Sequence, residues 1–153
     1  MKHIILPTDF SEIALNACNY ALRLFEKDRC TFYVVNCYAP LESHHSIYAT
    51  ALNWDAPDNI NRLNSEQGIQ RFVAKLKDAQ HKPWHFFKMV SSPRLLTNEI
   101  KDLIQKTDAE LVIMGTKGAS GLKEVFMGST TVHVIKSIKS CPVLAIPENF
   151  NFE

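Results

Sequence analysis

An uninterrupted apolar run at residues 111–114 (LVIM), followed at once by glycine, constrains the fold of this chain most strongly. Such a run is typical of a strand that is covered on both faces, as in a parallel sheet flanked by helices. We expect this strand to end at Gly115, where the chain leaves the sheet. Strands covered on both faces occur in layered α/β folds, so this one segment already favours that class.

The rest of the chain alternates between strand-like and helix-like patterns. Short apolar or β-branched runs predict strands at residues 3–6, 31–37, 84–90, 111–114 and 142–147. Apolar residues at helical spacing follow each of the first four runs. Strands that alternate with helices form parallel βαβ units. The sequence therefore predicts an α/β fold with a doubly wound sheet of five strands and four helices.

We expect hydroxyl residues to cap three of the helices, namely Ser11 for the first, Ser92 for the third, and Ser129 or Thr130 for the fourth. The second helix is predicted over about residues 58–80, and Gly68 is expected to weaken its centre. The residues predicted to face inward from the last three helices are Leu63, Ile69, Phe72, Val73, Leu76, Leu96, Ile100, Leu103, Ile104, Val132, Ile135 and Ile138.

Composition narrows the class of protein. A length of 153 residues is enough for one domain with a substantial core, which we assign to residues 1–148, with a tail at 149–153. The net charge of +1 gives no reason to expect a nucleic acid or a membrane surface as partner. No apolar run is long enough to cross a membrane, and the four cysteines show no CxxC spacing. We therefore expect a cytoplasmic protein with reduced cysteines.

Glycines are concentrated between Gly115 and Gly128, directly before the fourth predicted helix. Glycine lets backbone amides approach a ligand closely, and the N-terminus of a helix favours an anion. The segment therefore predicts a phosphate-binding loop, with a plain loop as the alternative. The spacing is neither that of a Walker loop nor that of the dinucleotide fingerprint GxGxxG.

The spacing Gly115-x2-Gly118-x9-Gly128-Ser129 resembles the nucleotide-binding signature of the universal stress protein family. The opening MKHIILPTDFSE and the closing CPVLAIP resemble the same family, so the resemblance covers nearly the whole chain. It implies a Rossmann-like sheet of the adenine nucleotide α-hydrolase type with strand order 3-2-1-4-5, which the sequence alone does not fix. In that order the ligand crevice lies beyond the carboxyl ends of the first and fourth strands.

The resemblance also implies which residues surround bound ATP and Mg²⁺. Asp9 would accept a hydrogen bond from a ribose hydroxyl or hold Mg²⁺ through water. The alternative is that Asp9 is a helix-capping or turn residue. Cys37 would lie along the adenine, a departure from relatives that more often have histidine and then an aliphatic residue. Lys117 would face the phosphates, with a solvated loop lysine as the alternative. The full predicted set is Pro7, Thr8, Asp9, Cys37, Met114, Gly115, Lys117, Gly118, Gly128, Ser129 and Thr130.

The resemblance implies a nucleotide-dependent regulator of the stress response. It also implies a homodimer formed through the edge strand at 142–147. No catalytic residue and no set of metal ligands is identified, so we expect slow ATP hydrolysis at most. The alternatives are a nucleotide-free interaction module of the same fold, a slow ATPase, and a flavodoxin-like carrier. The chain could also be one half of a tandem protein. The long connection at 38–57 is predicted to be a flap beside the nucleoside.

Overall fold

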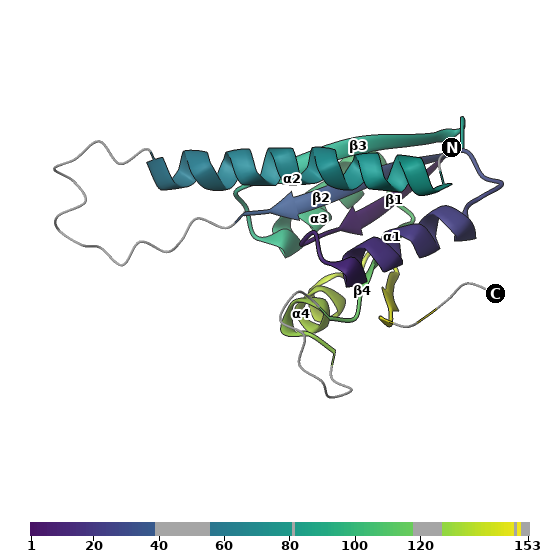
Figure 1. The fold of residues 1–153 in the computed structure, drawn as a ribbon. Coiled ribbons are helices and arrows are strands. Elements are labelled where there is room, and N and C mark those ends of the chain that lie inside the picture. The colour runs from purple at the N-terminus through teal and green to yellow at the C-terminus, as the bar shows by residue number, and fades with distance from the viewer. Residues whose placement is uncertain (39–55, 81, 118–126, 149, 151–153) are drawn as a thin grey trace, which may run out of the picture.

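The computed structural model describes residues 1–38, 56–80, 82–117, 127–148 and 150. Strands and helices alternate through these ranges, which contain five strands and four helices, as predicted (Figure 1). The third strand extends two residues beyond its predicted end. In order, the elements are β1 (Lys2–Pro7), α1 (Glu12–Leu24), β2 (Cys30–Cys37), α2 (Ala56–Gln80), β3 (His85–Ser92), α3 (Leu96–Thr107), β4 (Leu111–Gly115), α4 (Ser129–Ser137) and β5 (Val143–Ile146).

The strands form one parallel sheet in the order β3-β2-β1-β4-β5, which confirms the predicted fold. Strand β1 pairs with β2 on one side, where Pro7 lies opposite Val35. On its other side it pairs with β4, where Ile5 lies opposite Val112. The direction of winding reverses between β1 and β4. The loops that follow these two strands therefore diverge to opposite faces of the sheet and leave a crevice between them.

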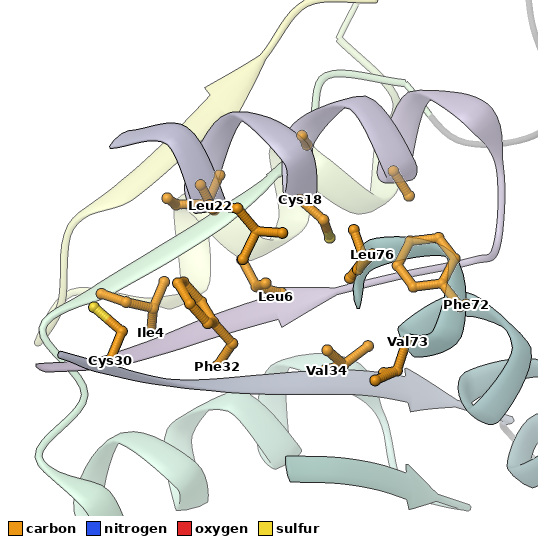
Figure 2. Close-up of a cluster of buried hydrophobic side chains, with 14 of the residues drawn as sticks. Ile4, Leu6, Cys18, Leu22, Cys30, Phe32, Val34, Phe72, Val73 and Leu76 are labelled. Atoms are coloured by element: carbon orange, nitrogen blue, oxygen red, sulfur yellow. The ribbon is translucent and has the colours of Figure 1, made fainter. Parts of the chain in front are cut away.

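Two hydrophobic clusters cover the two faces of the sheet. On one face, Ile4 and Leu6 of β1 pack with α1 and α2; on the other, Ile5 packs with α3 and α4. Successive residues of β1 therefore serve opposite layers, as the pleat of a strand requires. Figure 2 shows the first cluster, in which Phe32 and Val34 of β2 join side chains from both helices. The residues labelled there on the helices are Cys18, Leu22, Phe72, Val73 and Leu76.

Helix capping differs from the prediction at two of three helices. Ser11 Oγ accepts the Ala14 N–H at 3.2 Å, so this cap is confirmed. Ser92 is wrong as a cap, because it still pairs with Cys37 in the β2–β3 ladder, and α3 begins only at Leu96. The caps expected from Ser129 or Thr130 are also wrong. The N-cap of α4 is Gly128, and no side chain caps this helix.

Burial corrects the predicted inward faces of α2 and α4. Leu63 is 47% exposed, because α2 has 25 residues and is longer than the eight-residue strand β3 that it covers. Figure 1 shows the first turns of α2 extending past the sheet. On α4, Val134 is fully buried, whereas Val132 and Ile135 are half-buried.

Gly68 has a packing role that the sequence did not reveal. A Cβ atom at this position would lie 2.4 Å from Cε2 of Phe10. Phe10 follows β1 by three residues, has a left-handed backbone with φ of 66°, and places its ring 6.0 Å from that of Phe72. The glycine therefore makes room for the Phe10 ring, which packs against α2.

Several predictions concern residues outside the described ranges. The proposed flap at 38–57 is described only at its ends, where the Tyr38 N–H donates to the Ser92 carbonyl at 2.9 Å and α2 begins at Ala56. Gly118 and most of the predicted tail also lie outside. All four cysteines are unpaired thiols. Within the described ranges, every helix is too short or too polar to span a bilayer.

Candidate functional site

A cavity of about 320 Å³ lies at the carboxyl ends of β1, β2 and β4. This is the crevice where the winding of the sheet reverses, the usual ligand position in doubly wound folds. The segments that follow β1, β2, β3 and β4 form its walls, together with one residue of α1 and two residues of the first turn of α4. They contribute Pro7, Thr8, Asp9, Ala14, Asn36, Cys37, Arg94, Leu95, Leu96, Met114, Gly115, Lys117, Thr130 and Thr131.

The turn between β1 and α1 forms one wall and is fixed by local hydrogen bonds. The Thr8 N–H donates to the Val35 carbonyl at 2.8 Å, and the Asn36 side-chain amide donates to the Thr8 carbonyl at 2.8 Å. Asp9 Oδ1 accepts the Ser11 N–H at 3.0 Å, which is an Asx turn. The alternative role of Asp9 as a turn residue is therefore realised through Oδ1, while the same residue lines the cavity.

The opposite wall joins the end of β4 to the first turn of α4. The buried Thr131 hydroxyl donates to the Gly115 carbonyl at 2.9 Å, and the Gly128 N–H donates to the Thr116 carbonyl at 2.7 Å. These bonds hold the N-terminus of α4 beside the strand. The first N–H groups of a helix have no intrahelical acceptor and carry partial positive charge. With Lys117 lining the same region, this wall favours an anionic group.

Packing requires glycine at position 115, the last residue of β4. A Cβ atom at Gly115 would lie 2.7 Å from Cγ2 of Ile13 and 3.3 Å from the Ile13 carbonyl oxygen. Helix α1 therefore passes so close to the end of β4 that only glycine fits. From the sequence, we expected glycine here so that a ligand could approach the backbone. The structure gives a second reason, which is the close passage of α1.

Cys37 lines the cavity at the end of β2 as a neutral thiol. Burial, and to a smaller extent the nearby Glu99 carboxylate, raise its pKa to about 11, although Arg94 opposes both effects. Because the thiolate is the reactive form, a pKa this far above neutral pH makes Cys37 an unreactive packing residue.

Arg94 is a cavity residue that the sequence analysis missed. Its Nη1 lies within hydrogen-bond distance of the Asp102 carboxylate and 3.5 Å from Glu99 Oε2. The prediction placed Ser92 at the start of a helix, which would have put Arg94 inside the first turn. The strand order could have placed Arg94 at the cavity. Strand β3 lies beside β2, so the residues that follow these two strands meet at one edge of the sheet.

Most residues of the predicted site come together at this cavity. Gly128 and Ser129 do not line it, although they directly precede Thr130, and Gly118 lies outside the described residues. Among the described residues, no group of three or more histidine, cysteine, aspartate or glutamate side chains is arranged to hold a metal ion. The predicted residues that do line the cavity are Pro7, Thr8, Asp9, Cys37, Met114, Gly115, Lys117 and Thr130.

The sequence matches the model of the universal stress protein family over residues 1–147. Universal stress protein MJ0531 of Methanocaldococcus jannaschii is 27% identical over 150 residues, covering 95% of this chain and 81% of the relative. Universal stress protein Sll1388 of Synechocystis sp. is 28% identical over 154 residues, covering 94% of this chain and 96% of the relative.

Solved structures share the fold. The universal stress protein UspA of Lactobacillus plantarum superposes with a TM-score of 0.68 at 21% identity, covering 95% of this chain and 97% of that one. The universal stress protein of Archaeoglobus fulgidus in complex with dAMP gives a TM-score of 0.57 at 15% identity, over 95% and 97% of the two chains. Two further similar structures hold a nucleotide. One is a universal stress protein in complex with cAMP, and the other is a universal stress protein family protein of Arabidopsis thaliana with AMP bound.

Proposed function

Because the chain belongs to the universal stress protein family, we propose that it binds an adenine nucleotide, ATP with Mg²⁺, in the cavity beyond β1 and β4. The observation that carries this proposal is the meeting of the β1–α1 turn with the N-terminus of α4 at one cavity. The adenine nucleotides bound by proteins of the same fold support the choice of ligand.

Each wall of the cavity suits a different part of the nucleotide. We expect Pro7, Thr8 and Cys37 to face the nucleoside, and Met114 and Gly115 to flank the ribose. Asp9 supplies one carboxylate, which fits a magnesium ion carried mainly by phosphate oxygens and water rather than by a cage of protein ligands. The phosphates would meet Lys117, Gly118, Gly128, Ser129 and Thr130.

We propose a nucleotide-dependent regulator of the stress response rather than an enzyme. Phosphoryl transfer needs a positioned nucleophile and compensation for developing charge. Asp9 is the one carboxylate among the described cavity residues, and its Oδ1 accepts the Ser11 N–H. Backbone amides and hydroxyls that bind the ground state and the transition state equally do not raise the chemical rate. The unpaired thiols support a reducing compartment, the cytoplasm.

Isothermal titration with Mg·ATP tests the binding proposal. We expect one saturable site per chain. Lys117→Gln should lower the affinity for ATP by about tenfold, because a charge-assisted contact to phosphate is lost. Adenosine should bind the variant and the unaltered protein equally. Lys136→Gln removes an exposed lysine from the last turn of α4, at the end of the helix away from the cavity, and should leave the ATP affinity unchanged. Titrations of the unaltered protein without saturable heat would refute nucleotide binding.

We further propose a homodimer formed through β5. Among the described residues, this strand pairs only with β4 and ends the sheet, so its outer edge can offer backbone groups to a second copy. Leu144 is half-buried and packs against the hydrophobic cluster on the face of the sheet that α1 and α2 cover. Leu144→Asp should shift the protein from dimer to monomer in sedimentation velocity, with circular dichroism confirming that it is folded. Met89→Asp places the same charge on the opposite edge strand, where Met89 is 53% exposed, and should leave the dimer intact. A monomeric unaltered protein at high concentration would contradict the proposal.

A further inference from the structure

The cavity has a second cationic side chain, at the end away from the proposed phosphate wall. Arg94 follows β3, whereas Lys117 follows β4, and two strands lie between these in the sheet. Three interstrand spacings separate β3 from β4, about 14 Å in all. If the phosphates meet Lys117 and the N-terminus of α4, the nucleobase points toward Arg94. Any contact between Arg94 and the base therefore rests on the proposed nucleotide binding.

Two carboxylates hold the Arg94 guanidinium in place. Nη1 contacts both Asp102 and Glu99, and Glu99 in turn accepts the Ser92 hydroxyl at 2.8 Å. Arg94 also donates its backbone N–H to Ser92 Oγ at 3.2 Å. Among the described residues, the side-chain contacts of Arg94 run through Nη1, so the Nε and Nη2 donors are available to a ligand. Its side chain is 45% exposed, and the neighbouring cavity residue Leu95 is 63% exposed.

The charges around Arg94 decide what kind of group it suits. Asp102 also lies 3.9 Å from Lys106, so two cations and two carboxylates form a cluster without net charge. Such a cluster offers oriented N–H donors but little net attraction for a phosphate. A neutral ligand group with hydrogen-bond acceptors fits it better than an anion does. The apolar surface of Leu95 beside it suits the face of an aromatic ring.

We propose that Arg94 is a specificity-determining residue that donates hydrogen bonds to acceptor atoms of the nucleobase. A guanidinium presents two parallel N–H donors, which match the adjacent N7 and O6 acceptors of guanine. Adenine presents N7 beside an amino group, which is itself a donor, so it offers this fork a single acceptor. Arg94 therefore extends the ligands of this cavity to guanine nucleotides.

Titrations of ATP, GTP and GMP into the unaltered protein and the Arg94→Gln variant test this role. Arg94→Gln should lower the affinity for GTP by about tenfold and the affinity for ATP by about threefold. Guanine loses hydrogen bonds to two acceptor atoms, whereas adenine loses one. The loss for GMP should equal the loss for GTP, because the contact is made by the base. Arg94→Lys keeps the charge but loses the fork, so it should show the same change in the ratio of GTP to ATP affinity.

Asp102→Asn should act in the same direction as Arg94→Gln, because it frees the guanidinium from its position. Lys101→Gln, an exposed change on the same helix, is the matched control and should leave both affinities unchanged. A ratio of GTP to ATP affinity that Arg94→Gln and Arg94→Lys leave unchanged would overturn the base contact. So would a loss that grows with the number of phosphates. If the unaltered protein binds neither nucleotide, the proposed function itself fails, which is a distinguishable result.

Discussion

Replacement of Gly115 by valine is expected to lower the free energy of unfolding by about 3 kcal/mol and to abolish nucleotide binding. Strand propensity alone predicts the opposite sign, because valine is favoured in strands and glycine is not. The clash decides the outcome. A Cβ atom would lie 2.7 Å from Ile13 Cγ2, and the Ile13 carbonyl oxygen, which belongs to the backbone of α1, is 3.3 Å away. Either α1 or the end of β4 must move, and both form walls of the cavity.

Urea denaturation and Mg·ATP titration measure the two effects of the Gly115 change. Gly115→Ala should show the same sign with a smaller loss, because it lacks the γ-methyl groups. In an Ile13→Ala background the added cost of Gly115→Ala should fall, since the nearest clashing atom is gone. A valine variant with the unfolding midpoint of the unaltered protein would mean that α1 does not constrain this position.

The alternation of strands and helices could be predicted because burial imposes a period on the sequence. Ile4, Ile5 and Leu6 are fully buried and serve both faces of the sheet, so the strand appears as a continuous apolar run. The strand order came from the resemblance, because periodicity within one strand carries no information about its neighbours. The end of β3 could not be predicted. Ser92 has the local signature of a cap, but its pairing with Cys37 of β2 keeps it in the sheet.

The candidate site was predictable where its residues come directly after a strand. Pro7 ends β1, and Thr8 and Asp9 are the next two residues, so the sheet alone brings them to the carboxyl edge. Arg94 was missed, because its position depends on where β3 ends and on carboxylates from the next helix. A sequence pattern indicates which residues leave the sheet together, but not which side chains from a neighbouring helix orient them.

Gly68→Ala should destabilise the protein, although helix propensity predicts a gain of about 1 kcal/mol for alanine over glycine in a helix interior. The new methyl group would lie 2.4 Å from Cε2 and 2.6 Å from Cζ of Phe10. An aromatic ring could swing away at little cost if nothing held it. Here the ring also faces Phe72 and is attached to a left-handed backbone, in a turn whose neighbouring residues are fixed by hydrogen bonds. Overpacking of this kind costs about 1–3 kcal/mol, so we expect a net loss of about 1 kcal/mol.

A double-mutant cycle with Phe10→Ala tests this origin of the Gly68 effect. Once the ring is removed, Gly68→Ala should become stabilising, because the helix-propensity gain is then unopposed. Gln70→Ala, an exposed change two residues further along α2, should be nearly neutral in both backgrounds. Phe10 directly follows Asp9. In the single variant Gly68→Ala, the displaced ring should therefore also lower the affinity for Mg·ATP, although Gly68 does not line the cavity. Urea denaturation of the four proteins gives the coupling free energy. A stabilising Gly68→Ala change in the presence of Phe10 would show that the ring yields freely and that α2 is not packed tightly against the β1–α1 turn.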